Sequence, residues 1–119
     1  MNDKESLPRE IVQILSTQIG KDNAIPRDEL LNRLLMLGIP VSDRQMREAI
    51  ETARANEYRG AWICSSLDGK GYYMAATGDE LMEYAHTELN RARSIYQRVN
   101  QQVKRALPHL SGQFTLQEG

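Results

Sequence analysis

The sequence predicts a mainly α-helical protein with one small β-hairpin, an α+β fold class, that ends in a long helix. Two observations carry this prediction. Apolar residues recur at three- and four-residue spacings in several stretches before residue 57, and again after residue 77. Between these stretches, two short strand-like runs flank Leu67-Asp68-Gly69-Lys70, and Asp-Gly at such a place is a strong hairpin signal.

The composition indicates a soluble cytoplasmic protein. A chain of 119 residues has the length of one compact domain with an extension. No apolar run approaches the length of a membrane span, and the N-terminus lacks the pattern of an export signal. The single cysteine, Cys64, fits a reducing compartment. The net charge of −1 means that any contact with nucleic acid needs positive charge concentrated on one surface.

Two helices are expected first. The first has a stripe of Leu7, Ile11, Ile14, Leu15 and Ile19, with Ser6 as a cap at its start and Gly20 as a left-handed cap at its end. The second has an apolar face of Leu30, Leu31, Leu34, Leu35 and Leu37, and ends at Gly38. Residues 24–26, Ala-Ile-Pro, are a candidate for a very short strand between them.

A third helix, 43–56, follows a short turn. Ser42 and Gln45 form a capping box, in which each side chain bonds the other residue's backbone N–H. One face of the helix is apolar, with Met46, Ala49, Ile50 and Ala53. The opposite face carries charged side chains, namely Arg44, Arg47, Glu51 and Arg54.

The hairpin is expected from strand-like runs at 58–66 and 71–76. Its aromatic residues, Trp62, Tyr72 and Tyr73, fit a core packed against three helices better than a base-stacking surface. Cys64 lies in an apolar run, where an inert packed thiol is expected.

This order of elements is that of a winged helix-turn-helix with a long C-terminal helix. The stretch LGIPVSDRQMREAIETARANEYRGAWICSSLDGKGYYMA resembles winged-helix DNA-binding domains of bacterial and phage regulators and, more loosely, small proteins of phages and prophages. The resemblance covers roughly residues 7–76. We therefore expect a winged-helix domain at 1–76, a long helix at 77–107 and a flexible tail at 108–119.

The resemblance implies duplex DNA as the partner, with helix 43–56 in the major groove and hairpin 67–71 as the wing. A transcriptional regulator or a phage-type replication or accessory factor would use such a surface. Guanine readout is expected from Arg44 or Arg47, adenine readout from Gln45, and phosphate contacts from the start of the helix and the wing tip. The candidate DNA-binding residues are Ser42, Arg44, Gln45, Arg47, Arg54 and Lys70.

Two readings without DNA remain open at this stage. The same side chains could form a solvated face, with Gln45 occupied by the capping box. Winged helices also serve as protein-binding modules, so an adaptor with a protein partner and no nucleic-acid binding is the alternative function.

The long helix predicts self-association. A heptad seam runs through it, expected to form the dimer contact, with Met82, Ala85, Leu89, Ala92, Tyr96, Val99, Val103 and Ala106. Residues 79–88 carry four acids and no base, whereas 91–105 carry five bases and no acid, which favours an antiparallel homodimer. A helix of about 30 residues spans roughly 45 Å, too long to fold back entirely on a small domain. The basic half could instead bind DNA or RNA.

The sequence gives little reason to expect an enzyme. His86, His109 and Cys64 lie far apart in the sequence, so no metal site is predicted. The chain has no Gly-rich phosphate loop and no nucleophile-elbow motif, so no catalytic residue and no cofactor are expected.

Overall fold

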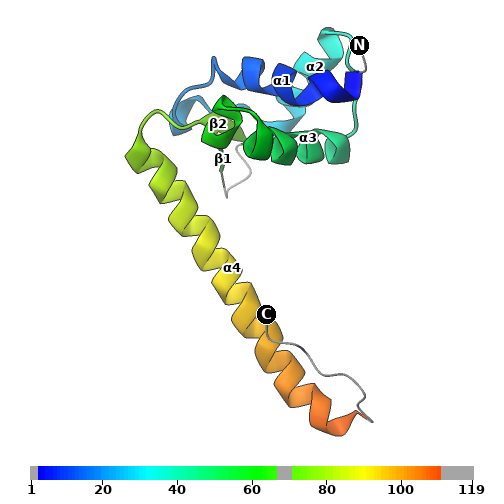
Figure 1. Cartoon of the computed structure of the whole chain (residues 1–119), viewed down its shortest axis with the longest axis vertical. Coiled ribbons are helices and arrows are strands. Elements are labelled where there is room, and N and C mark those ends of the chain that lie inside the picture. Colours follow the sequence, from blue (N-terminus) through cyan, green and yellow to red (C-terminus); the bar gives the residue numbers. More distant parts are fainter. Residues whose placement is uncertain (1–2, 67–70, 111–119) are drawn as a thin grey trace. The chain divides into compact units, whose positions relative to one another are not determined.

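The computed structural model describes residues 3–66 and 71–110, and the side chains from Ser6 onward within these ranges (Figure 1). The elements follow in the order α1 (Asp3–Leu15), η1 (Lys21–Asn23), α2 (Arg27–Met36), α3 (Asp43–Asn56), η2 (Arg59–Trp62), β1 (Ile63–Ser65), β2 (Tyr72–Met74), α4 (Gly78–Ala106) and η3 (Leu107–His109). The mainly helical α+β class with a small antiparallel hairpin is confirmed. Two compact units divide the chain, Met1–Tyr84 and Ala85–Gly119.

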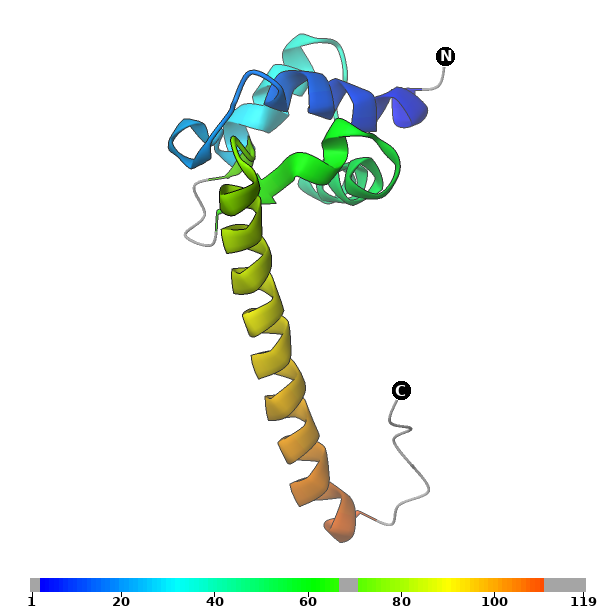
Figure 2. The same cartoon turned by 60° about the vertical axis from the view of Figure 1, so that its left-hand side comes forward.

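The N-terminal unit has one main core, to which α1, α2, α3 and both strands contribute. Figure 2 shows α1 lying across α3 in this unit. The predicted apolar face of α3 is confirmed, because its members are all buried. The buried side chains of the core are Leu7, Ile11, Leu15, Ile25, Leu30, Leu34, Met46, Ala49, Ile50, Ala53, Ile63 and Met74.

The first helix differs from its prediction at both ends. It begins at Asp3, so Ser6 lies inside the helix and not at its cap. It ends at Leu15, four residues before Ile19, because the backbone then turns to meet β2. The Gln18 carbonyl accepts a bond from the Met74 N–H, and the Gly20 N–H donates to the Met74 carbonyl. Gly20 has a positive φ of 90°, but its ψ of 151° lies far from the left-handed helical region, and α1 has already ended at Leu15, so Gly20 is not the predicted cap.

The segment before α2 pairs with the hairpin at one residue. The N–H of Ile25 donates to the Tyr72 carbonyl at 2.8 Å, and the N–H of Tyr72 donates to the Ile25 carbonyl at 2.9 Å. The strand expected at 24–26 is therefore a single antiparallel bridge. Gly71 makes it possible, because a Cβ there would overlap the Ile25 carbonyl.

The turn between α2 and α3 is closed by a cap on each side. The N–H of Ile39 donates to the Leu34 carbonyl and the N–H of Gly38 to the Leu35 carbonyl, the Schellman pattern, with Gly38 at φ 81°. Ile39 packs against the core, as this motif favours. The chain therefore turns sharply, and only six residues separate α2 from α3.

Not every leucine of the predicted α2 face is buried. Leu30 and Leu34 are fully buried, whereas Leu35 and Leu37 are exposed. Met36 between them is 79 % exposed. These last residues form an apolar end of α2 that the N-terminal unit leaves uncovered. We call Leu35, Met36 and Leu37 the aliphatic tip.

The hairpin pairs Ile63 with Met74, Cys64 with Tyr73 and Ser65 with Tyr72. The predicted turn at 67–70 lies outside the described residues. Tyr73 is buried and Tyr72 half-buried, but Trp62 is 40 % exposed and ends η2, so its prediction as a core residue is wrong. Cys64 is buried as expected, and burial raises the pKa of its thiol to about 11.

The long helix begins at a capped end. The Thr77 hydroxyl accepts a bond from the Glu80 N–H at 3.1 Å. The Glu80 carboxylate in turn accepts bonds from two backbone groups, the N–H of Ala76 at 3.0 Å and the N–H of Lys21 at 3.3 Å. The first turns of α4 therefore belong to the N-terminal unit.

The remainder of α4 forms the second unit together with η3. The helix is 29 residues long and has no buried residue. Its length agrees with the prediction, and Pro108 lies inside η3. In the described part of the chain, no helix combines the length and apolar character that crossing a bilayer requires. The tail from 111 to 119 lies outside the described residues.

Candidate nucleic-acid interface

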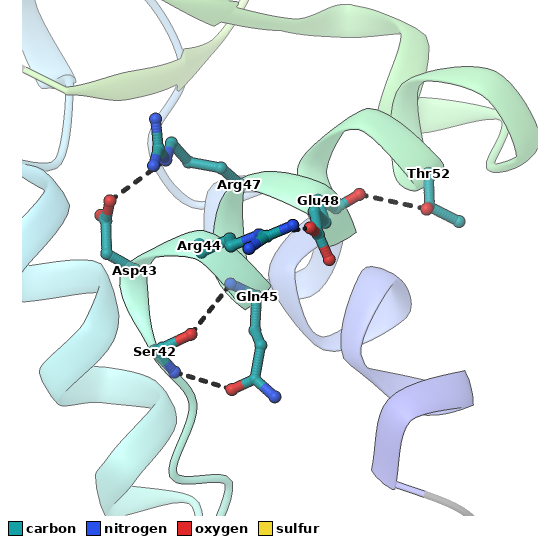
Figure 3. Close-up of polar contacts among 7 residues, drawn as sticks. All are labelled: Ser42, Asp43, Arg44, Gln45, Arg47, Glu48 and Thr52. Atoms are coloured by element: carbon teal, nitrogen blue, oxygen red, sulfur yellow. Dashed lines mark hydrogen bonds and ion pairs between the residues drawn. The ribbon is translucent and has the colours of Figure 1, made fainter.

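The start of α3 is held by the predicted capping box (Figure 3). The Ser42 hydroxyl accepts a bond from the Gln45 N–H at 3.1 Å, and the Gln45 carboxamide oxygen accepts one from the Ser42 N–H at 2.9 Å. Because both partners are used, the first turn of α3 is fixed in direction. The Gln45 carboxamide oxygen is occupied by this cap, whereas its NH₂ group remains a donor at the surface.

Arg44 and Arg47 both lie on the exposed face of α3, as predicted. Arg44 Nε lies 3.0 Å from a carboxylate oxygen of Glu48, and its side chain is 83 % exposed. Arg47 Nε lies 3.1 Å from a carboxylate oxygen of Asp43. Both are one-turn ion pairs on the helix surface, a class worth at most about 0.5 kcal/mol each. Such pairs orient the guanidinium groups but hold them only weakly.

Arg27 joins this surface from the start of α2. Its Nε lies 3.1 Å from the second carboxylate oxygen of Asp43, so Asp43 is shared between Arg27 and Arg47. Sequence reasoning missed Arg27, because it lies sixteen residues before Asp43 and no local pattern links the two. The three side chains bring two guanidinium groups and one carboxylate together between α2 and α3.

Arg54 does not share this exposed face. Its side chain is only 23 % exposed, its Nε donates to the Ile63 carbonyl at 3.2 Å, and its Nη1 pairs with Glu51. Its guanidinium also lies 5.7 Å from the centre of the Tyr84 ring. The prediction that Arg54 lies on the open surface beside Arg44 and Arg47 is therefore corrected. Arg54 ties α3 to β1 and to the first turns of α4.

The hairpin lies next to this surface through Tyr72. Burial raises the pKa of the Tyr72 hydroxyl, and the nearby guanidinium of Arg54 opposes that rise. The tyrosine therefore remains a neutral donor at neutral pH. A pocket of about 250 Å³ separates the start of α2 from the hairpin, lined by Pro26, Arg27, Asp28, Ser65, Ser66, Gly71 and Tyr72.

Lys70, predicted at the tip of the hairpin, lies outside the described residues. The base of the hairpin is described, and it is closed by the Ser66 N–H donating to the Gly71 carbonyl at 2.8 Å. Of the candidate residues, the structure brings Ser42, Arg44, Gln45 and Arg47 together and adds Arg27. We call these five residues the candidate surface.

The arrangement offers hydrogen-bond donors for anionic and polar partners. Arg27, Arg44 and Arg47 are exposed and can exchange their carboxylate partners for phosphate oxygens or base edges. Among the described residues, no group of three or more histidine, cysteine or acidic side chains is arranged to hold a metal ion.

Comparison with protein-family models, with curated proteins and with solved structures finds no match for this chain. The site therefore has to be interpreted from its own geometry.

Proposed function

We propose that the N-terminal unit is a winged-helix module that binds duplex DNA, with α3 in the major groove and the hairpin beside it. The observation that carries the proposal is the exposed first half of α3. Its apolar face is anchored in the core, its start is fixed by the capping box, and Arg44 and Arg47 extend from the opposite face. This is the geometry in which a recognition helix presents its first turns to base edges.

Within this proposal the residues have different tasks. Arg44 and Arg47 can each donate two bonds to guanine, and each well-made contact contributes about 1–3 kcal/mol of discrimination. Arg27 is placed to meet a phosphate beside the groove. Gln45 is a single donor here, because bidentate contact with adenine needs the carboxamide oxygen that the cap occupies. Arg54 supports the fold rather than the contact.

The ion pairs of these arginines do not prevent DNA binding. An exposed pair contributes at most about 1 kcal/mol, whereas a hydrogen-bonded contact of arginine with phosphate or guanine is stronger in the groove. The pairs do lower the positive potential that attracts DNA from a distance. Binding should therefore be modest without the correct base sequence and strongly dependent on salt.

The test is fluorescence anisotropy of a labelled duplex library with the full chain, at about 50 mM and about 200 mM salt. The double variant Arg44→Ala, Arg47→Ala is compared with Arg9→Ala, Arg33→Ala. The control variant removes the same amount of positive charge. Arg9 and Arg33 lie outside the candidate surface and also have carboxylate partners, Glu57 and Glu29.

We expect wild type and control to bind, with affinity that falls as salt rises. The Arg44, Arg47 variant should lose most of this binding, because it lacks both guanine contacts, each of which contributes about 1–3 kcal/mol. An equal loss of DNA affinity in both double variants would indicate that binding depends on net charge and not on a defined surface. Absence of binding by wild type at low salt would contradict the proposal.

The aliphatic tip supports a second candidate function, a protein-binding adaptor. Leu35, Met36 and Leu37 are adjacent and exposed at the end of α2, away from the arginine pairs of α3. An exposed apolar patch is a frequent feature of protein contact sites. The adaptor would be supported if wild type does not bind DNA but does capture a protein partner. Met36→Glu should then abolish this capture, and Arg44→Ala should leave it intact.

A further inference from the structure

The heptad seam of α4 has no buried member in the single chain: Ala85 and Val103 are half-buried, and the other six residues are exposed. Leu89 is 63 % exposed and Tyr96 62 %, and Val99, Met82 and Ala92 are also exposed. Ile95, beside the seam, is 43 % exposed and widens the apolar face. A regular helix with such a stripe along one side needs a partner surface of the same length.

Large and small side chains alternate along the seam. Their order is such that, when a second copy runs in the opposite direction, large residues of one helix lie opposite smaller residues of the other. The seam has a positions at Met82, Leu89, Tyr96 and Val103 and d positions at Ala85, Ala92, Val99 and Ala106. In an antiparallel pair, each a position lies opposite a d position of the other helix. When the two copies are centred between Ala92 and Tyr96, Ala92 lies opposite the partner's Tyr96. The same register places Ala85 opposite the partner's Val103, Leu89 opposite the partner's Val99 and Met82 opposite the partner's Ala106.

This register fills the seam evenly. Each layer combines a larger side chain with a smaller one, so the helix axes can keep one spacing. A parallel pair would put Tyr96 against Tyr96 and Ala92 against Ala92 in successive layers, which demand different spacings. An antiparallel shift of one heptad would leave seam residues at one end of each helix without an opposite seam residue. The centred antiparallel register is the one in which all eight seam positions are matched.

The charges of α4 select the same orientation. The acids Asp79, Glu80, Glu83 and Glu88 precede the bases Arg91, Arg93, Arg98, Lys104 and Arg105. In the antiparallel pair, each acidic half runs beside the partner's basic half, and in a parallel pair like charges run together. Glu88 and Arg91 pair only loosely within the chain, at 4.0 Å.

We propose that a second copy of this chain covers the seam, as an antiparallel homodimer in which Ala92 packs on the partner's Tyr96 and Leu89 on the partner's Val99. Side-chain size and charge order support this occupant independently of each other. The proposal does not depend on the DNA-binding function, because neither the seam nor its test involves nucleic acid.

The first test uses two matched substitutions on α4. Ala92→Glu puts a carboxylate in the seam, and Ser94→Glu puts one on the opposite face of the same helix. Sedimentation equilibrium of the full chain at micromolar concentration gives the dimer Kd. We expect wild type and Ser94→Glu to be dimers, and Ala92→Glu to raise Kd by about a hundredfold, or about 2.8 kcal/mol. A monomeric wild type, or equal effects of both variants, would overturn the proposal.

The second test reads the orientation by disulfide cross-linking under mild oxidation. Leu89→Cys and Val99→Cys chains are prepared singly, one with a mobility tag, and then mixed. The native Cys64 is buried and its pKa is raised to about 11, so it contributes little cross-linking. A bridge requires Cα atoms within about 7 Å, which only the proposed register gives for this pair.

Covalent mixed dimers that appear only when Leu89→Cys and Val99→Cys are combined support the proposed register. Efficient cross-linking of Leu89→Cys with itself would indicate parallel helices and overturn the orientation. A dimer in which neither combination cross-links would overturn the register. Loss of DNA binding with an intact dimer would leave this inference standing, so the two proposals can fail separately.

Discussion

The hairpin and the Ile25 segment meet at Gly71, and an alanine there should strongly destabilise the N-terminal unit. Two separate effects act at this residue. Its φ of 112° lies in a region that L side chains rarely adopt, at a cost of about 1–2 kcal/mol. An added Cβ would also overlap the carbonyl of Ile25, which accepts the bond from the Tyr72 N–H. Overpacking of this kind costs about 1–3 kcal/mol or more, so we expect a loss of about 2–5 kcal/mol for Gly71→Ala.

Three other glycines separate the two effects. Gly38 has φ 81° but open space around its Cβ position, so Gly38→Ala should lose only the conformational part, about 1–2 kcal/mol. Gly60 has no positive φ, but a Cβ would overlap the Ala53 carbonyl, so Gly60→Ala should lose only the steric part, about 1–3 kcal/mol. Gly78 has neither feature, and Gly78→Ala should stabilise by about 0.5–1 kcal/mol.

Urea unfolding followed by tryptophan fluorescence measures these differences. Trp62 is the only tryptophan of the chain and lies between α3 and β1, so its signal reports the N-terminal unit and not the later turns of α4. For a unit of this size, about 1 kcal/mol corresponds to roughly 4–8 °C in Tm. The reasoning would be refuted if Gly71→Ala unfolded at the wild-type midpoint, or if Gly38→Ala lost as much stability as Gly71→Ala.

Two further predictions concern the candidate surface and the buried thiol. Glu48→Gln should tighten DNA binding about two- to fivefold, because it releases Arg44 from its carboxylate and removes a negative charge; weaker binding in the same anisotropy assay would argue against Arg44 as a contact. The unfolding free energy should fall as pH rises from about 9 to 11, because burial raises the pKa of Cys64 from 9.0 to about 11 and the unfolded state loses that proton first. Cys64→Ala should reduce this slope in urea titrations at alkaline pH, and an unchanged slope would assign it to Tyr73, whose pKa burial raises to about 12.

The features that the sequence predicted well depend on neighbours a few residues apart. The capping box of Ser42 and Gln45 is decided within one turn, and so is the end of α2 at Gly38. The apolar face of α3 follows from helical periodicity alone. The length of α4 was predictable for the same reason, since its pattern has no break before Pro108.

The features that were missed depend on partners far along the chain. The end of α1 at Leu15 is set by two backbone bonds of Met74, whose N–H donates to the Gln18 carbonyl and whose carbonyl accepts from the Gly20 N–H, more than fifty residues away. The orientation of Arg54 is set by the Ile63 carbonyl, which helical periodicity does not contain. Arg27 reaches the candidate surface only because the start of α3 lies beside the start of α2, which no local sequence pattern shows. Local patterns therefore predicted the elements, but not which side chains meet between them.

The methionines that the structure describes differ in exposure, so their oxidation can report which surfaces of the molecule are covered. Met46 and Met74 are fully buried, whereas Met36 on the aliphatic tip and Met82 at the start of the seam are open to solvent. Mild peroxide should convert the thioethers of Met36 and Met82 to sulfoxides before those of Met46 and Met74. Protection of Met82 would report a covered helix seam, and protection of Met36 would report a partner on the tip. Mass spectrometry of one oxidised sample can therefore monitor both surfaces without any added label.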